Sequence, residues 1–257
     1  MDAQGYCMRW QDNAERRGVA AHAVAEIARR HGVTAARFEA LEGMAELNDP
    51  HGKSFFLIPA YADGARARDA ALMTYILNAD TGYGKPDRPP TDFPAAPYSA
   101  VEVGRIMSRQ NANRWSYSRD VPFVHRNGGR LVATPNGMLM GLGGNWIQRL
   151  FSQRGGTTWG DIFMMNTGRP ADPGGQLRQV VASGYAWYLD GSGIPRASRL
   201  DLDRVLHHEE RHAAQWADRG YLGMLVGYGR ELFRELVFGA VNRFEQDAGL
   251  ADGGYRA

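Results

Sequence analysis

The chain has 257 residues, of which 44% are hydrophobic, and a formal net charge of +2. This length can bury one large core or two small ones. The nearly balanced charge gives no electrostatic reason to expect a nucleic acid or an acidic membrane as partner. Cys7 is the only cysteine, which excludes an intramolecular disulfide and a zinc knuckle built from thiolates.

The sequence contains neither the pattern of a secretory signal nor a run of about eighteen uncharged apolar residues. We therefore expect a protein without a membrane span. Its expected location is the cytoplasm, or outside the cell after export without a cleaved signal peptide.

The first eighty residues show mainly helical periodicity. Residues 13–30 predict one helix, and residues 28–41 carry small, turn and core residues where a helix-turn-helix has them. The stretch 20–42 thus resembles a DNA-reading unit, but Glu39 and Glu42 on its second helix would face phosphates. We favour an ordinary helical hairpin and keep a DNA-binding regulator as an alternative function.

A short apolar segment at 55–58 and a helix over 63–78, capped by Asp63, complete this helical region, 1–80. Residues 81–97 are rich in proline and glycine and can form neither a helix nor a central strand. We interpret 81–97 as a linker and 98–257 as a second domain.

The second domain begins with a helix from Ser99 to about Asn113 and then changes to strand periodicity. Residues 121–126 and 129–134, joined by Asn127-Gly128, predict a hairpin, and a second turn at 135–137 leads into another strand. We expect a small antiparallel sheet, continued by 157–166 and 184–189. The fold class that these patterns predict is α+β.

The stretch 205–216 contains His208, Glu209 and His212 in the arrangement H-E-x-x-H. In a helix, the two imidazoles lie on one face and can hold a single Zn²⁺, while Glu209 activates the water that the metal binds. Apolar residues at steps of three and four predict such a helix. A weak capping box at 198–201 should begin it, and Gly220 should end it.

A catalytic zinc normally takes three protein ligands, and two carboxylates are candidates for the third. Glu245 lies at the end of the next predicted helix, whose apolar stripe from Leu222 to Phe244 should pack it against the motif helix as a core helix. Asp218 instead follows His212 by six residues. Asp218 stands where metzincin-like enzymes, which the motif also resembles, carry their third ligand. Those enzymes turn the chain back at a glycine midway, where this sequence has Gln215. Along an unbroken helix, a side chain six residues further on points away from the metal. We therefore prefer Glu245 and keep Asp218 as the alternative.

Other residues near the motif have expected supporting roles. Gln215 lies one turn beyond the metal face and is a candidate for orienting His212. His207 points about 100° away from His208 on a helix and is not expected to be a ligand. Candidates for stabilising an oxyanion, chosen by proximity in the chain, are Tyr221, Tyr228 and Tyr255.

Two resemblances extend the motif. H-E-x-x-H followed some thirty residues later by a helical glutamate resembles the gluzincin class of metallopeptidases. The strand-like stretch 157–166 followed by H-E-x-x-H-x-x-Q is similar to zincin-like domains of bacteria, which implies that this stretch lies beside the metal helix and can offer its edge to a peptide.

These resemblances imply a zinc-dependent metallopeptidase-like hydrolase, in which water activated by Glu209 attacks a peptide bond of a peptide or protein substrate. The main alternative is a zincin-like protein that does not cut peptides and serves as a binding or structural component.

Overall fold

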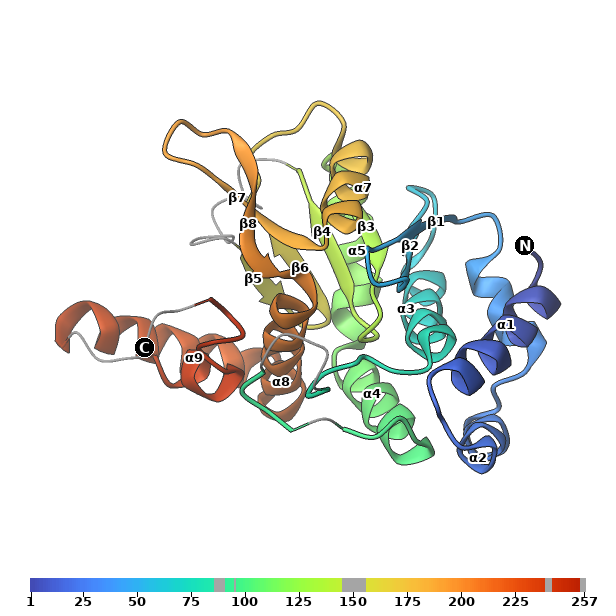
Figure 1. Cartoon of the computed structure of the whole chain (residues 1–257). Helices are drawn as coiled ribbons and strands as arrows, with labels where there is room; N and C mark the ends of the chain where they lie inside the picture. The colour runs from blue at the N-terminus through green and yellow to red at the C-terminus, as the bar shows by residue number, and fades with distance from the viewer. Residues whose placement is uncertain (86–90, 95, 145–155, 239–241, 255–257) are drawn as a thin grey trace.

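The computed structural model describes residues 1–85, 91–94, 96–144, 156–238 and 242–254. Within 156–238, side chains are described up to residue 227. The helices are α1 (Ala3–Arg16), α2 (Ala21–His31), η1 (Ala35–Leu41), α3 (Gly64–Asn78), α4 (Ala100–Ala112), η2 (Ser116–Asp120), α5 (Val121–Arg126), α7 (Pro173–Ser183), α8 (Leu202–Phe238) and α9 (Arg243–Ala248). The fold is a mixed α+β arrangement (Figure 1).

Six strands form the main sheet, in the order β1-β2-β3-β4-β6-β5. These strands are β1 (Ala45–Asn48), β2 (Ser54–Leu57), β3 (Arg130–Ala133), β4 (Leu139–Leu142), β5 (Gly156–Trp159) and β6 (Ile162–Met165). The expected antiparallel sheet is in fact mixed, because β4 and β6 run parallel. β2 pairs with β3, so strands from before and after the stretch 81–97 share this sheet.

Helices cover both faces of the sheet, because its strands are apolar on both sides. On one face, Phe56, Leu131 and Ile162 join a core with α1, α3 and α4. On the other face, Phe55, Val132 and their neighbours pack against α7 and the first turns of α8. The metal-motif helix is therefore fixed against a fully buried sheet face.

The N-terminal region differs from its prediction in two places. The single helix expected over 13–30 is two helices, α1 and α2, because the chain turns at Gly18 with φ +71. The second helix of the expected helical hairpin is a short 3-10 helix, η1, whose Phe38 and Leu41 are fully buried. These apolar side chains tie η1 to the core.

The segment predicted as the first strand of a hairpin, 121–126, is the helix α5. Pro122 lies in the first helical turn, where the lack of an N–H is tolerated. Gly128, with φ +84, ends this helix rather than forming a strand turn. The second predicted turn is confirmed, since β3 and β4 pair around residues 134–138.

The stretch 157–166 lies in the sheet as expected, but most of it forms a hairpin, β5–β6, that turns at Gly160 (φ +57). Residues 184–189 do not continue this sheet. They include β7 (Tyr185–Leu189), which pairs with β8 (Pro195–Asp201) in a separate two-stranded sheet. Residues 198–201, expected to open the metal helix, are thus the end of β8, and α8 begins at Leu202.

Helix α8 is interrupted at Gly220, which has the non-helical angles φ 68 and ψ 169. The expected end of the metal helix is confirmed, and a second helical stretch follows directly. The core helix expected there is not borne out in its described part, because Leu222 and Val226 of the predicted apolar stripe are 74% and 73% exposed, whereas Met224 is buried. Among the described residues, no helix has the length and apolar character needed to cross a membrane.

Candidate metal centre

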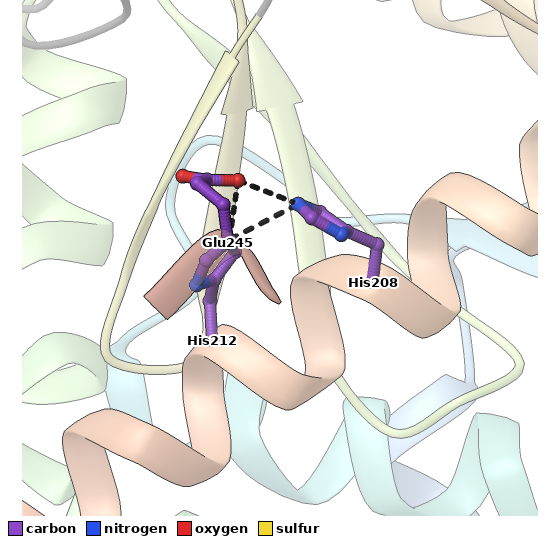
Figure 2. Close-up of side chains that lie close together, drawn as sticks. All are labelled: His208, His212 and Glu245. Atoms are coloured by element: carbon purple, nitrogen blue, oxygen red, sulfur yellow. Dashed lines mark hydrogen bonds and ion pairs between the residues drawn. The ribbon is translucent and has the colours of Figure 1, made fainter. Parts of the chain in front are cut away.

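The first half of α8 and the short helix α9 bring three side chains together beside β5 and β6 (Figure 2). His208 and His212 lie one turn apart on α8, and Glu245 approaches them from α9. Glu245 is thus not on a continuation of α8. Asn242 caps α9 by accepting a hydrogen bond of 3.0 Å from the backbone N–H of Phe244, which starts a new helix close to the motif.

The three potential ligand atoms form a small triangle. Nε2 of His208 lies 3.0 Å from Nε2 of His212. Oε2 of Glu245 lies 3.3 Å from the first nitrogen and 3.5 Å from the second. His208 and His212 are only 3% and 9% exposed, so this triangle is shielded from most of the solvent.

Hydrogen bonds on the far side of each imidazole fix the tautomers. Nδ1 of His208 lies 3.0 Å from the carbonyl oxygen of Gly249, which can only accept, so this nitrogen carries the proton. Nδ1 of His212 lies 2.9 Å from Oε1 of Gln215. Each ring therefore turns its Nε2 towards Glu245.

The orientation of Gln215 follows from its other contacts. Its Nε2 donates to the carbonyl oxygen of Phe244 at 3.0 Å and to Oδ2 of Asp247 at 2.9 Å. Both partners are acceptors, so the amide oxygen must face His212. Gln215 thus orients His212, the role expected for it, and also ties α8 to α9 next to Glu245.

The electrostatics of the triangle favour a positive charge. Burial on its own lowers the pKa of His212, but Glu245, Glu209 and Gln215 outweigh it and raise this pKa to about 9. Burial raises the pKa of Glu245, but His208 and His212 outweigh it and hold the pKa well below its usual range. Without a metal, a proton is therefore retained in the cluster.

The residues fit a tetrahedral transition-metal ion. Zinc bonds of about 2.0–2.1 Å to imidazole nitrogen and carboxylate oxygen separate tetrahedral ligand atoms by about 3.3 Å, and the three observed separations lie on either side of this value. Oε2 of Glu245 is buried and accepts no hydrogen bond within the described part of the chain. Two imidazoles and one carboxylate suit zinc and its first-row neighbours better than calcium or magnesium.

Glu209 is buried next to the triangle, and a residue of the edge strand β5 holds its carboxylate by a hydrogen bond. Its Oε2 accepts a hydrogen bond of 2.6 Å from the hydroxyl of Thr158. The carbonyl oxygen of Thr158 in turn accepts from the indole of Trp216, at 2.9 Å. The expectation that the stretch 157–166 lies beside the metal helix is therefore confirmed.

Tyr188 on β7 is a further side chain near Glu209. Burial is the main cause that raises the pKa of its phenol to about 12, and the negative charge of Glu209 adds to it. The hydroxyl consequently keeps its proton at neutral pH and can donate a hydrogen bond.

The opposite side of α8 is anchored by a buried charge network. Arg109 on α4 donates to Oε1 of Glu210 at 2.6 Å and to Oδ1 of Asp161 at 3.2 Å. Burial on its own raises the pKa of Glu210, but Arg109 and Arg105 outweigh it and lower the pKa. This network fixes the rotation of α8, and with it the direction of the motif side chains.

The other residues singled out in the sequence lie elsewhere. Asp218 is exposed and is not part of the converging group. His207 points away from the triangle and contacts Asp252 at 3.0 Å. The ring of Tyr221 packs edge-on against Trp115 at 4.9 Å, while the side chains of Tyr228 and Tyr255 are outside the described residues.

Three residues next to the motif were missed, namely Thr158, Tyr188 and Gly249. The resemblance to zincin-like domains pointed to the strand that carries Thr158 but not to its hydroxyl. Tyr188 and Gly249 lie on segments whose packing against α8 leaves no periodic signal in the sequence.

Comparison of the chain with known protein families, with curated proteins and with solved structures found no match.

Proposed function

We propose that the protein is a zinc-dependent hydrolase that cleaves peptide bonds, with His208, His212 and Glu245 as metal ligands and Glu209 as general base. The observation that carries this proposal is the triangle of acceptor atoms, 3.0–3.5 Å apart, with both imidazole tautomers fixed so that Nε2 faces inward.

Zinc bound there would polarise a substrate carbonyl and lower the pKa of a water molecule that it binds. Glu209 would accept the proton of the attacking water as the new C–O bond forms. It would then pass that proton to the amide nitrogen as the C–N bond breaks, so that an amine leaves. Thr158 holds the carboxylate of Glu209 in place through its 2.6 Å hydrogen bond.

A peptide is the proposed substrate because β5, the edge strand of the sheet, lies directly beside Glu209. An edge strand can pair with an extended peptide through its backbone.

The test combines metal analysis with a screen for peptide cleavage. The wild-type chain should bind one zinc ion and cleave a subset of peptides. Glu209→Gln should retain the zinc ion and lose cleavage, since only the proton acceptor is removed. Asp218→Asn, a change at an exposed carboxylate, is the matched control and should retain both. Cleavage by Glu209→Gln at the wild-type rate would refute the assigned role.

The burial of the metal ligands also favours a second candidate, a metal-stabilised binding or structural protein without hydrolysis. His208 is 3% exposed, and a backbone carbonyl covers its outer side. One bound zinc ion per chain, together with no cleavage across a broad peptide library, would favour this second function.

A further inference from the structure

Reciprocal hydrogen bonds join residues 91–92 to residues 251–252, which are far apart in the sequence. We call this pair of contacts the clasp. Oδ2 of Asp92 accepts hydrogen bonds from the backbone N–H groups of Ala251 and Asp252, at 2.9 and 3.1 Å. Oδ2 of Asp252 accepts in return from the hydroxyl of Thr91 at 2.6 Å and from the N–H of Asp92 at 3.3 Å. We call residues 249–252 the C-terminal strap. The stretch before α4 and the chain after α9 both pass close to α8 (Figure 1).

The clasp is fastened to α8 beside the metal motif. Asp252 is fully buried, and its carboxylate also contacts Nε of Arg204 at 3.2 Å and Nδ1 of His207 at 3.0 Å. The ring of His207 stacks on Tyr83 at 4.2 Å and meets the edge of Phe93 at 5.3 Å. A buried carboxylate with this many donors holds its segment firmly.

Gly249, the first residue of the strap, contacts His208, one of the proposed metal ligands. The carbonyl oxygen of Gly249 is the acceptor for Nδ1 of His208, at 3.0 Å. Gly249 has φ +90, and a Cβ at this position would lie 2.7 Å from Oδ2 of Asp92 and 2.8 Å from Cε2 of Phe93. Only glycine therefore fits between the clasp and His208 without moving one of them.

We propose that Gly249 and Asp252 are positioning residues of the metal site: the clasped strap holds the carbonyl that fixes His208 with Nε2 directed at Glu245 and His212. The inference rests on the metal site of the proposed function and adds a determinant that contributes no ligand. Groups that orient a ligating histidine typically change metal affinity by about 10- to 100-fold when they are lost.

Two variants and two matched controls test this role through zinc affinity, measured by competition with a chromophoric chelator. Gly249→Ala displaces the strap, and Asp252→Asn weakens its anchorage. Gly191→Ala is the control for an added methyl group, since nothing lies within 4 Å of that position. Asp190→Asn is the control for the carboxylate, because Asp190 also accepts from a hydroxyl, from backbone N–H groups and from an arginine, but on the β7–β8 hairpin.

The strap variants should bind zinc about 10- to 100-fold more weakly than the wild type, and both controls should bind as the wild type does. The visible spectrum of the cobalt(II)-loaded variants should also change, which a general loss of stability would not cause. If Gly249→Ala does not fold, Asp252→Asn still decides the question. Wild-type affinity in the strap variants would overturn the strap's role alone, whereas a wild-type chain that binds no zinc would overturn the proposed function as well.

Discussion

Two buried polar clusters lie on opposite sides of the first half of α8, and they differ in how their charges are balanced. In one cluster, Arg109 donates to Asp161, to Glu210 and to the carbonyl oxygen of Gly137. In the other, the imidazoles of His208 and His212 and the carboxylate of Glu245 direct acceptor atoms at one another. The first cluster contains its own cation, and the second is arranged to receive one.

The difference separates a structural role from a binding role. Buried ions are tolerated when partners within the chain satisfy them, and the network of Arg109 meets this condition. Three acceptors in van der Waals contact repel one another unless a proton or a metal ion lies between them. A cation bound in the candidate metal site would therefore stabilise the fold, whereas the arginine network needs no ligand.

The largest expected effect comes from breaking the balanced network. Arg109→Met leaves Glu210 and Asp161 buried without their main cation and should lower the free energy of unfolding by about 3–5 kcal/mol. Urea denaturation of the metal-free chain measures this loss. Arg105→Met is the control, since the Arg105 side chain is 45% exposed, and should cost less than about 1 kcal/mol. Equal effects of the two changes would contradict the comparison.

The next effect concerns stabilisation by zinc. At a free zinc concentration of about 100 times its Kd, the wild-type chain should gain about 2.7 kcal/mol in unfolding free energy. Glu245→Gln removes the anionic ligand and should lose most of this gain, while Asp218→Asn should keep it. Thermal denaturation with zinc and with a chelator checks both variants. A full gain in Glu245→Gln would exclude Glu245 as a ligand.

The pH dependence of zinc binding sharpens the comparison further. Because the carboxylates raise the pKa of His212 to about 9 in the metal-free site, zinc must displace a proton below that pH. The affinity should therefore rise about tenfold for each pH unit between about pH 6 and 8. Competition titrations at several pH values measure this slope. A flat profile would mean that no proton is released on binding.

The smallest expected effect comes from the hydroxyl that holds Glu209. Thr158→Val removes its hydrogen bond and should lower the free energy of unfolding by about 1 kcal/mol. In an active enzyme, kcat should also fall while zinc affinity stays unchanged. Thr157→Val, on the neighbouring residue of β5, serves as the control. A loss of zinc from Thr158→Val would show that Thr158 supports the ligands rather than Glu209.

The sequence was sufficient to predict the elements with strong local signals. The metal helix, its end at Gly220, the helix capped by Asp63 and the turn between β3 and β4 are all present. The convergence of His208 and His212 follows from helical geometry alone. Gln215 could be placed by the same argument, because it lies one turn from His212.

The errors arose where tertiary contacts decide the local structure. Residues 121–126 are a short apolar run followed by Asn127-Gly128, a pattern that predicts a hairpin, yet Pro122 lies in the first turn of a helix that packs against the sheet. The strap at residues 249–252 depends on contacts with Asp92, about 160 residues away in sequence, which no window of neighbouring residues contains.

X-ray absorption at the zinc edge of the zinc-loaded chain reports directly which atoms bind the ion. We expect one zinc ion per chain with two imidazole nitrogens and carboxylate or water oxygen at about 2.0–2.1 Å, and the loss of one imidazole in His208→Ala. A first shell of oxygen atoms alone, or a wild-type spectrum from His208→Ala, would contradict this expectation.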